Sequence, residues 1–343
     1  MDLIPDWNGK FEDIIPGHLI VTGKMRFSTG GSVPNTGVAL KRLGLDPILI
    51  GKIGNDLIGR ITLEVINSNG EDLTMHMIKS NQSGSSYTLV FSPPNTDRAF
   101  FHYPGVNDTF CAEDISFDDL KGRIFHFGYP PVMEKIYEND GNELVKIFKN
   151  AHEHNMITSL DMSMPDPKSK AGKVDWRKFL SNVLPHTDIF LPSLDEILYM
   201  TRMDGDLSHK LLIDLTDELT SWGTKITVIK LGKNGAYLRS GKIKSDDLVS
   251  NIIEPKEWSE LELFSTAYET NVKGTTGAGD SSIAGFLAKF ADGSDPKSTL
   301  DFMCAVGASC TEAIDSTSGV RSMREIEKRM RDGWKRLPSD LPN

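Results

Sequence analysis

A chain of 343 residues with 38% hydrophobic and 25% charged side chains has the composition of a globular protein, and its length suits one large α/β domain. The formal net charge of −10 argues against a nucleic-acid partner, which requires a basic face. No apolar run is long enough to span a membrane and no signal peptide is evident, while three cysteines without a C-x-x-C pair favour a cytoplasmic setting.

Short apolar runs alternate with segments of helical periodicity along most of the chain. Strands are predicted at residues 47–53, 123–127, 156–161, 188–191 and 226–231. Helices are predicted at residues 34–43, 56–67, 141–154, 176–184, 193–202, 207–222, 278–290, 296–313 and 323–336. This alternation favours a mostly parallel sheet with helices on both faces, in a single domain that spans residues 1–343.

Three regions depart from the alternation. Residues 17–27 contain a strand-like run at 18–23, and residues 85–103 contain two β-rich runs around a turn-like segment at 92–97. Residues 240–272 show no clear periodicity and are expected to form an extended excursion.

A glycine-rich segment opens the first predicted helix. Gly30, Gly31 and Asn35 form a G-G-x-x-x-N pattern. The two glycines would let a polar ligand lie against the backbone, and the Asn amide can both donate and accept hydrogen bonds, which suits a vicinal diol. A glycine-rich turn with Asn35 early in a helix is the purely structural alternative.

The sequence GTTGAGD at residues 274–280 lies just before an apolar helical segment. This pattern is typical of a tight loop that opens a helix, where free N–H groups and the helix dipole favour an anion such as phosphate. Asp280 would lie beside such a phosphate site and could accept a proton from an attacking hydroxyl. Thr-Gly and Gly-Asp pairs are also common at helix starts, so Asp280 as a simple helix N-terminal charge is the alternative.

Together, the segment from Gly30 to Gly59 and the 274–280 loop resemble the two signatures of the PfkB, or ribokinase-like, carbohydrate kinase family. Weaker matches to other motifs of the family lie between them in the expected order, at residues 105–107, 161, 191–196 and 231–235. The resemblance implies a ribokinase-like three-layer α/β/α domain with a small β-sheet lid built near residues 17–27 and 85–103. An ordinary surface hairpin is the alternative for the lid.

The implied activity is ATP-dependent phosphorylation of a hydroxyl group of a small sugar or sugar acid, with Mg²⁺ and with a homodimer formed through the lid. A nucleoside kinase of the same fold and a catalytically silent sugar- or nucleotide-binding regulator are the alternatives. A dinucleotide-binding dehydrogenase does not fit, because Ser282 stands where a third glycine is needed. A Walker-type NTPase does not fit either, because Arg60 and Ile61 replace its Lys-Ser/Thr pair.

The resemblance also implies roles for individual residues. Asp280 would be the general base, with the backbone N–H groups of Gly277, Ala278 and Gly279 facing the transferred phosphoryl group. The sugar would be bound by Asp2, Gly30, Gly31, Asn35, Arg98 and Asn107. The nucleotide site would use Ser193, Glu196, Lys230, Gly232, Gly235 and Gly307, with Glu196 organising Mg²⁺ through water. An exposed helix acid is the alternative for Glu196, a hairpin turn for Gly232 and Gly235, and close helix packing for Gly307.

Three positions depart from the family pattern. The strand expected before Asp2 is missing, which predicts a gap in the sheet and a natural start upstream of Met1 or a truncated chain. Ser193 replaces the Asn of an N-x-x-E motif. Gly274 replaces an acid, so a monovalent cation such as K⁺ would be held by the backbone carbonyls of Gly274 and Thr276.

Overall fold

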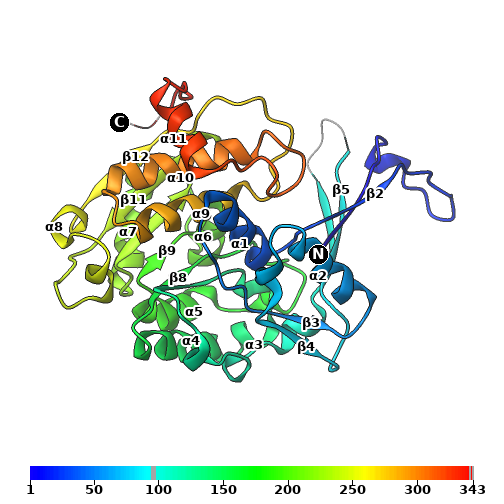
Figure 1. Ribbon diagram of the computed structural model, residues 1–343, viewed down its shortest axis with the longest axis horizontal. Helices are drawn as coiled ribbons and strands as arrows, with labels where there is room; N and C mark the ends of the chain where they lie inside the picture. The colour runs from blue at the N-terminus through cyan, green and yellow to red at the C-terminus, as the bar shows by residue number, and fades with distance from the viewer. Residues whose placement is uncertain (94–97, 340, 342–343) are drawn as a thin grey trace.

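A mostly parallel sheet forms the centre of the computed structural model, which describes residues 1–93, 98–339 and 341. Six strands make this sheet in the order β12-β11-β10-β9-β8-β7 (Figure 1). Strands β7 to β10 run parallel, and β11 and β12 add antiparallel. The strands are β7 (Ile124–Phe127), β8 (Ile157–Leu160), β9 (Ile189–Phe190), β10 (Ile226–Lys230), β11 (Ala236–Ser240) and β12 (Glu262–Ser265).

Helices cover both faces of this sheet because neighbouring strand residues point to opposite sides. Phe190 and Ile229 pack into one apolar cluster, whereas their neighbours Ile189 and Val228 pack into another. The first cluster takes helices α3 (Glu134–Tyr137), α4 (Asn142–Glu153), α5 (Trp176–Val183), α6 (Leu194–Thr201) and α7 (His209–Ser221). The second takes helices α1 (Ser32–Leu43), α8 (Pro255–Trp258), α9 (Ala278–Ala291), α10 (Pro296–Cys310) and α11 (Met323–Arg331). The predicted three-layer α/β/α arrangement is therefore confirmed.

A second, four-stranded sheet has the order β2-β1-β5-β6. Its strands are β1 (Asp2–Pro5), β2 (Met25–Ser28), β5 (Tyr87–Phe91) and β6 (Ala99–Tyr103). The pair of β-rich runs expected in 85–103 is present, and residues 94–97 of the expected turn lie outside the described part of the chain. The strand expected at 18–23 is wrong, because the antiparallel partner of β1 is instead Met25–Ser28.

A third piece consists of β3 (Gly51–Gly54) and β4 (Met77–Ser80), which pair with each other in parallel, with α2 (Leu57–Asn67) following β3. A cavity of about 1530 Å³ lies between this pair and the edge of the larger sheet, with Ile53 on one side and Phe127 on the other. Asp2–Pro5 pairs in the four-stranded sheet and not here. The β3–β4 pair is therefore separated from β7, the edge strand of the larger sheet. This interruption agrees with the gap expected from the sequence, and it leaves a large hollow beside β7.

The expected excursion at 240–272 is wrong in part, because Glu262–Ser265 returns to the larger sheet as its outer strand. Trp258, fully buried, anchors the connecting segment against Phe286 and Phe290 of α9. Within the described part of the chain, no helix combines the length and apolarity needed to cross a membrane.

Candidate active site

The start of α9 carries the 274–280 loop. Gly277 is the N-cap and has a φ of 73°, a left-handed conformation that favours glycine. A Cβ at this position would overlap the backbone of Ser316. The first-turn N–H groups of Gly279 and Asp280 have no partner within the helix, as at any helix start. The N–H of Ala278, in contrast, donates to the Thr275 carbonyl over 3.3 Å. The loop therefore places unpaired backbone donors next to Asp280.

Asp280 is only 2% exposed, and its two carboxylate oxygens have different partners. The Asn35 amide nitrogen donates to Oδ2 over 2.9 Å, and the Tyr129 hydroxyl donates to Oδ1 over 2.9 Å. Burial raises the pKa of the Asp280 carboxyl above its ordinary value, and the hydrogen bonds from Asn35 and Tyr129 oppose that shift. The result is a desolvated carboxylate held in a fixed orientation.

The two sequence motifs meet because α1 packs against α9. Gly31, with a φ of 86°, is the N-cap of α1 and places Asn35 in the helix's first turns. Behind them, the Thr29 and Ser316 hydroxyls lie 2.8 Å apart, and the Ser316 hydroxyl donates to the Thr29 carbonyl over 3.2 Å. These bonds tie the segment before α1 to the segment after α10, so the juxtaposition of Asn35 with Asp280 is built into the fold.

Asp2 lies against the same corner. It is 8% exposed, and a Cβ at Gly30 would overlap its carboxylate. Gly30 is therefore needed for the close approach of β1 to the start of α1. Burial raises the pKa of Asp2 to about 6, and the negative charge of Asp280 acts in the same direction. The structure thus brings Asp2, Gly30, Asn35 and Asp280 together.

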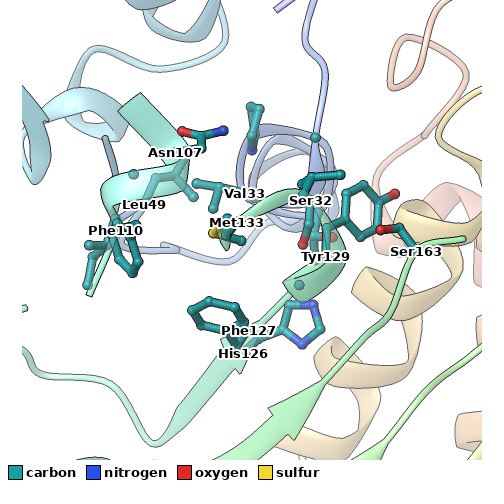
Figure 2. Close-up of a pocket in the computed structure, with 18 of the residues that line it drawn as sticks. Ser32, Val33, Leu49, Asn107, Phe110, His126, Phe127, Tyr129, Met133 and Ser163 are labelled. Carbon is teal, nitrogen blue, oxygen red and sulfur yellow. The ribbon is translucent and has the colours of Figure 1, made fainter. Parts of the chain in front are cut away.

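Arg98, at the start of the β6 arm, reaches the 274–280 loop. Its guanidinium donates to the Thr276 hydroxyl and, over 3.2 Å, to the Thr275 hydroxyl. The four-stranded sheet therefore contacts the loop that precedes α9. Asn107 lies in the segment Gly105–Thr109 and lines the cavity shown in Figure 2.

An ion pair lies buried beneath the site. Lys230, the last residue of β10, places Nζ 2.5 Å from Oδ1 of Asp161, which is 1% exposed. Burial alone would lower the pKa of Lys230, but the carboxylates of Asp161, Glu196 and Asp280 raise it above its ordinary value. A cation and several carboxylates therefore gather at the carboxyl ends of β8 and β10.

Ser193 and Glu196 form a capping box at the start of α6. The Ser193 N–H donates to Oε2 of Glu196 over 2.7 Å, and Glu196 also lines the cavity. Glu196 thus combines a helix-capping role with access to the site. Among the described residues, no cluster of three or more His, Cys, Asp or Glu side chains has the arrangement of a metal site.

The remaining predicted site residues lie outside the group formed by Asp2, Asn35 and Asp280. Gly232 and Gly235 lie in the turn of the β10–β11 hairpin, both with positive φ, which is the alternative stated for them. Gly307 lies against the Ser282 hydroxyl, so it allows close packing of α10 on α9. Gly274 lies next to the carbonyls of Ala313 and Ile314, and the thiol of Cys310 contacts the Thr276 carbonyl.

Sequence reasoning missed Tyr129. It follows β7 at the carboxyl end of the sheet, where open α/β sheets bind ligands, and the pattern Gly128-Tyr129-Pro130-Pro131 signals a rigid turn there. Those two signals could have marked the position, although its contact with Asp280 depends on the tertiary fold.

Comparisons with known proteins show the family to which the chain belongs. A model of the pfkB family carbohydrate kinases matches residues 2–322. A sugar kinase of Archaeoglobus fulgidus, itself uncharacterized, is 27% identical over 284 residues, covering 82% of this chain and 98% of that protein. A 5-dehydro-2-deoxygluconokinase of Clostridium perfringens is 26% identical, covering 87% and 84%.

Among solved structures, the ribokinase of Arabidopsis thaliana complexed with ribose and ATP superposes with a TM-score of 0.75. The match covers 95% of this chain and 94% of that one at 17% sequence identity. At this identity the likeness shows the fold, which is ribokinase-like.

Proposed function

The chain belongs to the pfkB family of carbohydrate kinases, and we propose that it transfers the γ-phosphoryl group of ATP to a hydroxyl group of a small sugar or sugar acid. The observation that carries this proposal is the buried Asp280 at the start of α9, held by Asn35 and Tyr129 next to unpaired backbone donors. A desolvated, oriented carboxylate beside an anion-binding helix start is the arrangement that phosphoryl transfer to a hydroxyl requires.

The transfer is a single displacement. The Asp280 carboxylate accepts the proton of the acceptor hydroxyl as that oxygen forms a bond to the γ-phosphorus. The bond between the γ-phosphorus and the bridging oxygen breaks, and ADP leaves with the electron pair. Backbone N–H groups at Gly277–Gly279 stabilise the negative charge on the transferred phosphoryl oxygens. Because the Ala278 N–H already bonds Thr275, it must exchange that partner or leave the task to its neighbours.

The sugar would lie at the corner formed by Asp2, Gly30 and Asn35, below the four-stranded sheet. The side-chain amide oxygen of Asn35, Oδ1, is buried without a protein partner, which supports a role as acceptor for a substrate hydroxyl. Arg98 and Asn107 would contact the substrate from the β6 arm and from the cavity wall. The four-stranded sheet would act as the lid that keeps water, a competing acceptor, away from the phosphoryl group.

The nucleotide would bind on the side of β10, with Lys230, Ser193 and the Gly232–Gly235 turn nearby and α10 with Gly307 beside it. Mg²⁺ keeps several water ligands and needs only one or two protein carboxylates, so Glu196 at the cavity wall fits a water-mediated role. When bound, the metal would neutralise phosphate charge. The carbonyls of Gly274 and Thr276 remain our proposal for a K⁺ site, which replacing KCl by NaCl in the assay would test.

We also propose that the protein forms a homodimer through the four-stranded sheet. Phe27, Phe100 and Phe101 of the four-stranded sheet are 48%, 55% and 59% exposed, which supports a homodimer formed through this sheet. Sedimentation of the wild-type protein and a triple Phe→Ser variant would test it.

The experiment is an ADP-release assay with Mg-ATP and a panel of ketoses, sugar acids and nucleosides. We expect one sugar class to turn over and Asp280→Asn to lose about 10²–10⁴-fold in rate. Asp195→Asn, a change of another acid in the first turn of a helix, is the matched control and should stay active. Equal turnover by wild type and Asp280→Asn would exclude Asp280 as the base. Turnover of nucleosides alone would favour the nucleoside kinase, and binding without turnover would favour the silent regulator.

A further inference from the structure

Tyr129 has a backbone conformation that is unusual for a bulky residue. Its φ is 62° and its ψ is 47°, in the left-handed region where non-glycine residues are strained. The conformation is held on both sides, because its N–H donates to the Asp161 carbonyl over 3.3 Å and its carbonyl accepts from Val132 over 3.1 Å. Strained residues persist where the surroundings fix them and are concentrated at functional sites.

The residues next to Tyr129 leave it little freedom. A Cβ at Gly128 would overlap the Ser32 hydroxyl, so this segment lies directly against the start of α1. Pro130 and Pro131 follow, both buried, and each fixes its own φ. Figure 2 shows the Tyr129 side chain beside Ser32 and Ser163, with His126 and Phe127 on the strand that leads to it. The direction of the Tyr129 hydroxyl is therefore set by the fold.

That hydroxyl donates to Oδ1 of Asp280 over 2.9 Å, while Asn35 donates to Oδ2. Tyr129 also lines the large cavity, so it lies between the cavity and the base. A carboxylate oxygen can accept two hydrogen bonds, so each oxygen keeps a lone pair for an acceptor hydroxyl while Tyr129 stays in place.

We infer that Tyr129 is a positioning residue for the base: its hydroxyl orients the Asp280 carboxylate and keeps it ionised while the acceptor hydroxyl binds. This inference rests on the proposed function, because it assigns Tyr129 a part in the same reaction.

The charges around Asp280 explain why one hydroxyl matters. Several titratable groups face Asp280 from the elements packed around it: Asp2 on β1, Asp161 after β8, Glu196 on α6, Lys230 on β10 and Cys310 on α10. Burial raises the pKa of Asp280, and Glu196 adds to that rise while Lys230 opposes it. Burial and the nearby carboxylates also raise the pKa of Tyr129 well above 10, so its hydroxyl stays protonated and remains a donor.

Tyr129→Phe is the test, because it removes the hydroxyl and keeps the ring. With the acceptor found in the panel, or water in its absence, we expect the acid limb of kcat/KM for ADP release to move up by about one pH unit. We expect kcat at pH 7 to fall by about tenfold and KM for ATP to stay unchanged. Tyr237→Phe is the matched control, since the Tyr237 hydroxyl also donates to a carboxylate, Glu262, over 2.9 Å.

A second measurement needs no turnover. The bond from Tyr129 stabilises the ionised form of Asp280, whose pKa is raised in the folded protein. The stability difference between wild type and Tyr129→Phe should therefore be small at low pH and grow as the pH rises through that pKa. Denaturant unfolding at a series of pH values measures it, and loss of the packing contacts of the hydroxyl alone would give a difference independent of pH.

Three outcomes would overturn the inference. One is an unmoved acid limb, and another is a stability difference independent of pH. The third is a higher kcat/KM in Tyr129→Phe, which would mean that Tyr129 blocks the acceptor. Asp280→Asn separates these from failure of the proposed function: if it is inactive while Tyr129→Phe behaves like wild type, only the role of Tyr129 is wrong.

Discussion

The 274–280 loop lies between two different environments, one around Asp280 and one around Arg98. Asp280 is buried, and its partners Asn35 and Tyr129 come from the packed α/β core. Arg98 reaches Thr275 and Thr276 from a sheet whose aromatic side chains are largely exposed. On the core side, both carboxylate oxygens of Asp280 already accept a hydrogen bond from the protein, so this side suits a fixed reaction step. The sheet side keeps exposed groups near the loop, so it suits selection of the acceptor.

Replacing Lys230 should give the largest effect, and it tests the core side. Lys230→Met leaves Asp161 buried without its cation, which costs about 3–5 kcal/mol of unfolding free energy for a buried pair. Denaturant unfolding at pH 7 measures it. Lys297→Met removes an exposed partner of Asp301, which keeps Arg336, and should change little. Similar small changes in both variants would mean that the core pair is no more constrained than a surface pair.

The next effect concerns the loop shared by the two sides. Gly277→Ala adds a Cβ where the Ser316 backbone lies and should lower the rate of ADP release about 100-fold by moving the start of α9. Gly44→Ala is the control, because Gly44 also has a positive φ, 100°, but has open space around it. Equal activity of the two variants would contradict the close fit of the loop.

A smaller effect is the pH dependence that His126 gives to the core side. Burial, aided by the charge of Lys230, lowers the pKa of His126 to about 3, and its Nε2 is buried without a partner. The folded protein thus keeps His126 neutral, while the unfolded chain takes up a proton below about pH 6.5. The stability that this neutral ring contributes is present above pH 6.5 and is lost as the pH falls toward 3.

Between pH 7.5 and 5 this loss should amount to about 1–2 kcal/mol of unfolding free energy. The ring also borders the cavity, which limits the size of the loss. His126→Gln should lose less stability over the same interval, and His18→Gln, at an exposed position, should behave as wild type. Parallel curves for wild type and His126→Gln would show that His126 is not desolvated.

The smallest effect is expected on the sheet side. Arg98→Ala should raise KM for the acceptor about tenfold and leave the melting temperature unchanged, because Arg98 is half-buried and contacts two hydroxyls. Arg26→Ala, on the same sheet and paired with Asp6 over 3.3 Å, is the control. A fall in kcat without a change in KM would mean that Arg98 acts in the reaction step and not in selection of the acceptor. The proposed difference between the core side and the sheet side would then be wrong.

The sequence predicts best what local patterns determine. Gly31 and Gly277 have the positive φ that their motifs suggest, and the helices they open bring Asn35 to Asp280. Residues 18–23 include the strand-like apolar run Leu-Ile-Val, yet Leu19 is 92% exposed. There the register of pairing with β1 selects residues 25–28 instead, and one sequence does not reveal that register.

Long-range contacts explain the other misses. Tyr129 lies about 150 positions from Asp280, so only the packed fold shows that they touch. The strand Glu262–Ser265 has no strong pattern of its own and is fixed by pairing with β11. The sequence therefore predicts Asn35 and Asp280 as site residues, while Tyr129, which lies between the cavity and Asp280, is found only in the structure.

The bond between Asn35 and Asp280 also bears on the order of folding, because it joins positions 245 residues apart. Closing so long a loop costs chain entropy and is slow compared with forming single helices. During synthesis, α1 emerges early, but its contact with α9 cannot form until α9 has left the ribosome. The corner that joins Asn35 to Asp280 is thus one of the last parts of the chain to assemble, and under the proposed function, phosphoryl transfer regained after refolding should lag behind the recovery of helix content.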